Sequence, residues 1–223
     1  METEVKLSFK DTDSLNAFSA AEEFRRLCVN ADESVPVLLE NIYLDTSSLT
    51  ISERGGMMRL RHYASEGMDS YEITVKYGGS AENGLHKRYE WNIPSVDGSY
   101  SIDSIKGSLK PGDDPAEMLE RVFDGLTDKD ISVICSNSFY RTTYNLLYGN
   151  SKIEACFDSG IIQGTEGRTD EICELELELI EGNVSDLNEL AELIKTLSGG
   201  IPMEDTKYRR TLALALDLSK YEK

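Results

Sequence analysis

Met1-Glu2-Thr3-Glu4-Val5-Lys6 opens the chain, and its alternating charged residues are the feature from which the fold can be predicted. Successive side chains of a strand point to opposite faces, so Glu2, Glu4 and Lys6 would share one face. Two carboxylates and an ammonium group are unusual in a packed core. They suit the wall of a wet, charged cavity, and we therefore predict a closed barrel with this face inside.

The same alternation of charged and apolar residues returns in several later segments. Arg59 and Arg61 share one face of a strand expected over residues 58–63, and the run Glu174 to Glu178 alternates most clearly of all. Further strands are expected over residues 35–44, 71–77, 87–93, 131–136, 138–148 and 152–157. Apolar residues at helical spacing predict helices over residues 14–29, 115–124, 186–197 and 203–220. These patterns together indicate an α+β protein in which helices cover a barrel.

The length and the apolar pattern limit the class of protein. A chain of 223 residues can form one large domain or two small ones. We expect a single domain over residues 1–223, because the strand pattern resumes in the same style after a connection at about residues 95–130. No apolar run approaches the roughly 20 residues that span a bilayer, and charged residues start at Glu2 where a signal peptide would be apolar. We therefore expect a cytoplasmic protein that does not bind membranes.

The charge and the metal-ligating residues exclude other classes. A formal net charge of -18 would repel a phosphate backbone, so no nucleic-acid partner is expected, although a small phosphorylated ligand remains compatible. The four cysteines show no paired ligand spacing and are expected to be reduced thiols. The two histidines are too few and too isolated for a zinc site.

The separation of acids from bases is the strongest indication of chemistry. A solvated strand face usually mixes Lys, Glu, Ser, Thr and Asn, whereas here one strand is basic at Arg59 and Arg61 and another is acidic from Glu174 to Glu178. Carboxylates aligned on one face repel one another unless a cation lies between them. Mg²⁺ or Mn²⁺ would be such a cation, and confined Arg and Lys side chains suit polyphosphate oxygens. The pattern therefore favours phosphoryl transfer, although a basic helix face is an equally good interpretation of Lys207 to Arg210 taken alone.

With these residues in view, the chain resembles the CYTH superfamily, the triphosphate tunnel metalloenzymes. The signature ExExK matches Glu2 to Lys6, and the other matching positions follow in the family's order: Arg59, Arg61, Lys76, Arg88, Glu90, Arg141, Glu154, Asp158, Glu174, Glu176, Glu178, Lys207 and Arg210. The resemblance covers nearly the whole chain. It implies an eight-stranded antiparallel β-barrel that forms a tunnel, with the C-terminal segment closing one end.

The resemblance also implies roles for individual residues. The residues expected to hold phosphates are Lys6, Arg59, Arg61, Lys76, Arg88, Arg141, Lys207 and Arg210. The candidate ligands of one or two Mg²⁺ or Mn²⁺ ions are Glu2, Glu4, Glu90, Asp158, Glu174, Glu176 and Glu178. The candidate catalytic residues are Lys6, Glu4 and Glu176.

Several activities share one site within the family, and the leading expectation is hydrolysis of inorganic triphosphate to pyrophosphate and phosphate. The alternatives on the same fold are a class IV adenylyl cyclase and a thiamine or nucleoside triphosphatase. A different class is a tunnel that binds polyphosphate or a nucleotide without turnover. The many acids disfavour that class, because a pure anion binder does not need them. A homodimer is a further possibility.

Overall fold

Eight antiparallel strands form a closed barrel in the computed structural model, which describes residues 1–65, 68–108 and 114–216. Along the barrel the order is β5-β4-β3-β2-β6-β7-β8-β1, and β1 pairs again with β5. A two-residue strand, β9 (Ile201–Pro202), adds to the edge of β1. The barrel strands are β1 (Glu2–Ser8), β2 (Val37–Asp45), β3 (Gly56–Ser65), β4 (Met68–Glu82), β5 (Leu85–Ser95), β6 (Ser132–Tyr148), β7 (Ser151–Gln163) and β8 (Thr169–Glu181). The expected α+β class and eight-stranded barrel are confirmed.

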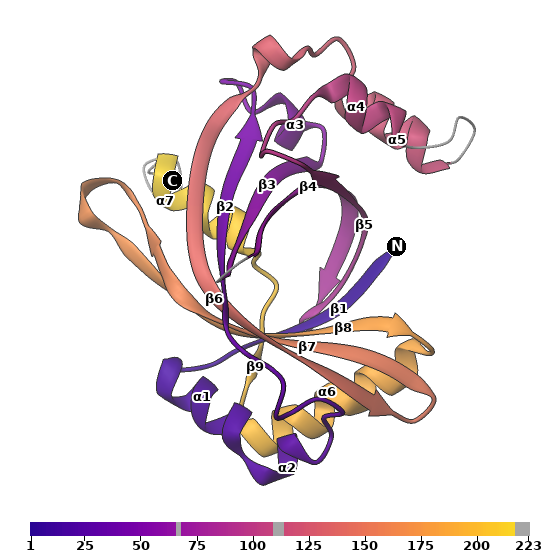
Figure 1. Cartoon of the computed structure of the whole chain (residues 1–223), viewed down its shortest axis with the longest axis vertical. Coiled ribbons are helices and arrows are strands. Elements are labelled where there is room, and N and C mark those ends of the chain that lie inside the picture. Colours follow the sequence, from indigo (N-terminus) through magenta and orange to yellow (C-terminus); the bar gives the residue numbers. More distant parts are fainter. Residues whose placement is uncertain (66–67, 109–113, 217–223) are drawn as a thin grey trace.

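Helices lie at two opposite ends of the molecule, with the barrel between them (Figure 1). One group is α1 (Thr12–Ala20), α2 (Glu22–Arg25) and α6 (Val184–Ser198). The other is α3 (Thr50–Glu53), α4 (Ile102–Gly107) and α5 (Asp114–Val122). Each group packs on the outer face of neighbouring strands and forms a separate apolar core with them.

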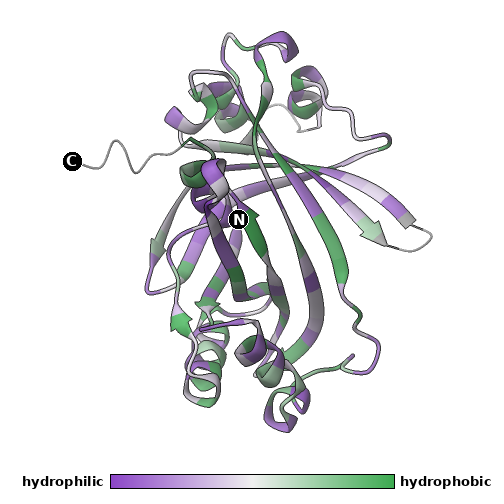
Figure 2. Cartoon of the chain, turned by 90° about the vertical axis from the view of Figure 1, so that its left-hand side faces the viewer, coloured by the Kyte–Doolittle hydropathy of each residue, from purple (hydrophilic) through white to green (hydrophobic). Residues whose placement is uncertain are grey.

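The barrel has a polar inside and an apolar outside because its strands alternate. Figure 2 shows hydrophilic and hydrophobic bands following one another along the strands. On β8, Leu175 and Leu177 are fully buried beneath Leu187 and Leu190 of α6, whereas Glu176 between them faces inward. Apolar packing outside the barrel therefore leaves its interior free for charged side chains.

Helix α7 (Lys207–Leu216) packs into one end of the barrel through residues at positions i, i+4 and i+7. Lys207 meets the inward carboxylates, and Thr211 accepts a hydrogen bond from Asn137. Leu214 packs on an apolar cluster of Leu39, Phe139, Ile162 and Ile172. The side of α7 that contacts the barrel is thus charged at Lys207, polar at Thr211 and apolar at Leu214.

Several expected boundaries were wrong. The helix expected over residues 14–29 is two helices, because Ala21 is extended with φ -64° and ψ 138°. The strands expected over residues 131–136 and 138–148 form the single strand β6, and α4 was not predicted. The expected C-terminal helix begins at Lys207, and its continuation to residue 220 lies outside the described residues. Within the described part of the chain, no helix has the length and apolar character needed to cross a membrane.

Replacing Leu177 by Ala tests the alternation that defines the barrel. The side chain is fully buried on the outer face of β8, so the change should lower the free energy of unfolding by about 2–5 kcal/mol. Ile180→Ala on the same strand is the matched control, because Ile180 is 57% exposed and the change should cost less than about 0.5 kcal/mol. Denaturant unfolding of both variants would measure the difference, and equal losses would contradict this arrangement of β8.

Candidate active site

The barrel encloses a cavity of about 300 Å³ with a densely charged wall. Eleven of the fifteen residues that were expected to bind phosphate or metal line it: Glu2, Lys6, Arg59, Arg61, Lys76, Arg88, Glu90, Arg141, Glu176, Glu178 and Lys207. The other four singled-out residues, Glu4, Asp158, Glu174 and Arg210, are not among the residues lining this cavity. Residues from six strands and one helix thus meet around a single space.

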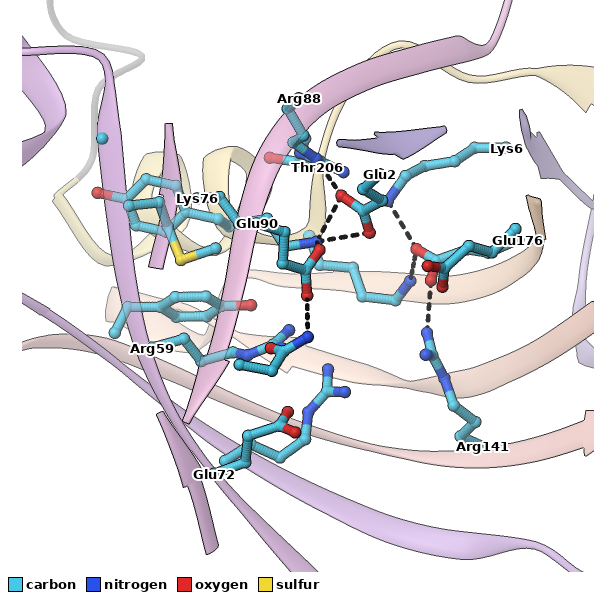
Figure 3. Close-up of a pocket in the computed structure, with 18 of the residues that line it drawn as sticks. Glu2, Lys6, Arg59, Glu72, Lys76, Arg88, Glu90, Arg141, Glu176 and Thr206 are labelled. Carbon is cyan, nitrogen blue, oxygen red and sulfur yellow. Dashed lines mark hydrogen bonds and ion pairs between the residues drawn. The ribbon is translucent and has the colours of Figure 1, made fainter. Parts of the chain in front are cut away.

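One side of the cavity carries a network of pairs from β1, β4 and β5. Lys76 Nζ lies 2.9 Å from Glu2 Oε1 and 2.6 Å from Glu90 Oε2. Arg88 Nε lies 2.9 Å from Glu2 Oε2 (Figure 3). Arg88 Nη2 also contacts Glu4. Burial alone would raise the pKa of Glu90, but the charge of Lys76, hydrogen bonds with Glu2 and Lys76, and the charge of Arg59 together outweigh burial and lower that pKa to about 2. Glu90 is therefore ionised at neutral pH, and the ammonium group of Lys76 balances its charge.

A second network surrounds Glu176 of β8. The antiparallel register places Lys6 directly opposite Glu176, with 2.6 Å between Lys6 Nζ and Glu176 Oε1. Arg141 Nη2 lies 2.5 Å from Glu176 Oε2, and Lys207 Nζ lies 2.9 Å from Glu176 Oε1. Burial opposes ionisation of Glu176, but the charges of Lys207, Lys6 and Arg141 hold its pKa well below the usual range.

Asp158, Glu174 and Glu176 are three buried carboxylates whose oxygens lie within 4.8 Å of one another, a spacing that could hold a metal ion. The ammonium group of Lys207 already occupies the centre of this cluster. Its Nζ lies 2.7 Å from Asp158 Oδ2 and 2.6 Å from Glu174 Oε2. A metal ion could bind here only by displacing Lys207. In this structure the cluster holds helix α7 in place through Lys207.

Two guanidinium groups on β3 lack an acidic partner. Arg59 and Arg61 are 8% and 7% exposed, and among the described residues no carboxylate lies within ion-pair distance of either. Arg59 Nε is buried without any hydrogen-bond partner, and burial together with the charges of Arg59 and Arg141 lowers the pKa of Arg61. Buried charges are costly unless paired, so this side of the cavity has the chemistry of an anion site.

Glu178 presents the opposite case, because no basic side chain in the described part of the chain lies within ion-pair distance of it. The register aligns Glu4, Glu178 and Glu154 in one row across β1, β8 and β7. Burial, followed by the charges of Glu2, Glu90 and Glu4, raises the pKa of Glu178 from 4.5 to about 8. Among the described residues, only Asp158, Glu174 and Glu176 bring three carboxylate oxygens within 4.8 Å of one another. The row is nevertheless a second candidate site, because carboxylates are the ligands that Mg²⁺ and Mn²⁺ prefer and no described cation lies within ion-pair distance of Glu178 or Glu154.

Arg210 lies apart from the cavity. Its Nε donates to Asp170 Oδ2 at 2.6 Å, and its other nitrogens contact Glu174 and the carbonyl oxygen of Glu171. These acceptors use the guanidinium group to fasten α7 to β8. The expected phosphate-binding role of Arg210 would need it to leave these partners.

Several residues on the wall had no expected role. Glu154 matches the family's order in the sequence without a role assigned to it, and the structure places it on the cavity wall opposite Glu178. Tyr43 and Tyr208 also line the wall, with ring centroids 4.9 Å apart. Their meeting could not be foreseen from the sequence, because one residue lies on β2 and the other on α7.

Comparison with known proteins agrees with this geometry. The sequence is 29% identical over 158 residues to an inorganic triphosphatase from Haemophilus influenzae, a match that covers 71% of this chain but only 40% of that protein. A putative adenylyl cyclase from Hippeastrum, described as having a dominant triphosphatase activity, superposes with a TM-score of 0.67 and 13% identity over 96% of this chain and 97% of its own. A putative adenylate cyclase from Bacillus halodurans gives a TM-score of 0.55 and 15% identity over 94% and 96% of the two chains.

Because the sequence identities of these two structural matches are low, the matches show a shared fold and nothing more. The CYTH domain model matches residues 1–212, nearly the entire chain. The protein therefore belongs to the CYTH domain family.

Proposed function

We propose that this protein hydrolyses inorganic triphosphate to pyrophosphate and phosphate with the help of Mg²⁺ or Mn²⁺. The observation that carries the proposal is that one cavity contains both cations and an acid that lack a partner of opposite charge. Among the described residues, Arg59 and Arg61 are buried cations without an acid at ion-pair distance, and Glu178 is a half-buried acid without a base at that distance. A polyphosphate anion together with a divalent cation would satisfy both. The similarity to a Haemophilus influenzae inorganic triphosphatase supports the same substrate.

The cations of the wall would bind the triphosphate chain. Arg59 and Arg61 are available without breaking an ion pair, and Arg guanidinium groups suit phosphate oxygens because they donate in pairs. Lys6, Lys76, Arg88, Arg141 and Lys207 are already paired and would share their charge between carboxylates and substrate. Because these contributors come from β1 through α7, we propose that residues 1–223 act as one triphosphate tunnel domain.

The acids of the wall would hold the metal ion. The row of Glu4, Glu178 and Glu154, with Glu2 and Glu90 beside it, is the best candidate set. A divalent cation bound there would neutralise phosphate charge and lower the pKa of water. Hydrolysis adds water oxygen to the terminal phosphorus and breaks its bond to the bridging oxygen, and the lost proton must pass to an acceptor. We propose that Lys6 stabilises the negative charge that develops on the phosphate, and that the carboxylates of Glu4 and Glu176 are candidate catalytic groups.

Phosphate release from inorganic triphosphate, ATP and thiamine triphosphate, measured side by side with Mg²⁺ and with Mn²⁺, tests the proposal. We expect inorganic triphosphate to be the best substrate, because a charged wall suffices to bind it. Cyclic AMP and pyrophosphate formed from ATP would instead indicate a cyclase. Binding of triphosphate without turnover of any of the three would indicate a binding module, and the enzymatic proposal would fall.

Replacement of Arg59 or Arg61 by Gln should weaken binding of triphosphate. Each loss removes a charged hydrogen-bond donor, which is worth about 1.5–3 kcal/mol and corresponds to roughly a 10- to 100-fold rise in Kd. The free protein should melt no lower than wild type, because the lost charge was buried and unpaired. Calorimetric titration and thermal melting would measure the two quantities. Arg26→Gln, just after α2 and with a side chain that is 72% exposed, is a charge-matched control whose Kd should stay near that of wild type.

Binding of Mg²⁺ should depend on pH through Glu178. In the metal-free protein a pKa of about 8 means that Glu178 is mainly protonated at pH 7. A bound cation must displace that proton, so the rise in melting temperature on adding Mg²⁺ should be larger at pH 9 than at pH 6.5. A chelator should abolish turnover.

The stability of the metal-free protein should also depend on pH through Glu178. Because folding raises the pKa of Glu178 from 4.5 to about 8, the folded state binds the proton more tightly, and stability should be lost as pH rises from 4.5 through 8. Glu178→Gln cannot ionise and should show a smaller loss across this window, with a weaker response to Mg²⁺. Identical pH profiles of the wild type and the variant would contradict the environment assigned to Glu178.

A further inference from the structure

The unpaired guanidinium group of Arg61 is held by a neutral amide. Arg61 Nε donates to Asn41 Oδ1 at 2.8 Å, across the pairing of β2 with β3. Asn41 is 1% exposed and Arg61 is 7% exposed, so water contributes little to this contact. The Arg61 guanidinium carbon lies 5.7 Å from the centroid of the Tyr63 ring, and Glu72 on the neighbouring strand accepts from Tyr63 Oη at 3.0 Å. The group is thus fixed in place without losing its charge.

The amide belongs to a buried relay that runs from the cavity to helix α7. Asn41 Nδ2 donates to Asn137 Oδ1 at 3.0 Å, and Asn137 Nδ2 donates to Thr211 Oγ1 at 2.8 Å. Thr211 in turn donates to the carbonyl oxygen of Lys207 at 2.6 Å. An arginine can only donate hydrogen bonds, so it requires the oxygen of Asn41 to face it. That requirement sets the direction of every later bond in the relay.

We propose that Asn41 is a positioning residue for triphosphate binding, because it orients Arg61 while leaving the full positive charge of Arg61 to the substrate. This inference rests on the proposed function, since it concerns the same ligand. A carboxylate at position 41 would hold the guanidinium group equally well, but it would neutralise the charge that the phosphate needs. The other paired cations of the cavity show the consequence, since each of them already shares its charge with an acid.

Asn41→Asp tests this proposal, because it replaces one nitrogen by an oxygen of similar size. Calorimetric titration with inorganic triphosphate in the absence of divalent metal measures Kd without turnover. We expect Kd to rise at least about tenfold, the equivalent of one lost charged contact. Asn41→Ala keeps the charge of Arg61 but loses its orientation, and Kd should rise by a smaller factor. Asn188→Asp adds the same charge on the exposed face of α6 and should leave Kd unchanged.

A double-mutant cycle separates positioning from a general structural effect. In an Arg61→Gln background, Asn41→Ala should change Kd less than about twofold, because no guanidinium group remains to be oriented. An undiminished effect in that background, or a wild-type Kd in Asn41→Asp, would overturn the proposal. If Asn41→Asp does not fold, a wild-type Kd in Asn41→Ala would overturn it as well.

The same titrations distinguish this proposal from the proposed function. A wild-type protein that binds inorganic triphosphate but does not hydrolyse it would end the enzymatic proposal and leave the role of Asn41 supported by the Kd values. A wild-type protein that does not bind inorganic triphosphate would overturn both.

Discussion

The placement of charge inside a closed barrel is the constraint on which the rest of this structure depends. Buried charges are costly unless each meets a partner. The barrel meets this demand mainly by cross-strand register, as where Lys6 lies directly opposite Glu176 and Lys76 opposite Glu90. Apolar cores outside the barrel supply the stability that such an interior cannot. The helices are therefore a requirement of the charged interior.

Function is concentrated where the pairing is incomplete. In the described part of the chain, no opposite charge lies within ion-pair distance of Arg59, Arg61 or Glu178. Lys207 shows the contrast, since three carboxylates surround it and hold α7 in the barrel. Clustered acids alone are thus a poor guide to a metal site. Lys207 contacts all three carboxylates of that cluster, whereas no described cation lies within ion-pair distance of Glu178 or Glu154.

Strand alternation made much of the fold and the cavity predictable from the sequence. Glu2 and Lys6 share a face because the side-chain period of a strand is two, and the same rule located Arg59, Arg61 and Glu176. The same rule could not reveal which residues far apart in the sequence contact one another. Arg210 carries the same charge as Lys207, yet only the structure shows that it turns away to Asp170. Asn41 carries no charge and therefore drew no attention, although it holds a cation of the cavity.

The protein's net charge of -18 and its proposed polyanionic ligand are compatible because charge acts locally. Seven cations line the cavity (Lys6, Arg59, Arg61, Lys76, Arg88, Arg141 and Lys207) against six acids (Glu2, Glu72, Glu90, Glu154, Glu176 and Glu178). One of those acids, Glu178, is mainly protonated at neutral pH. Most of the acidic excess therefore lies outside the cavity, where water and salt screen it. An incoming anion meets repulsion from the surface and attraction from the wall, and confinement at low dielectric favours the wall.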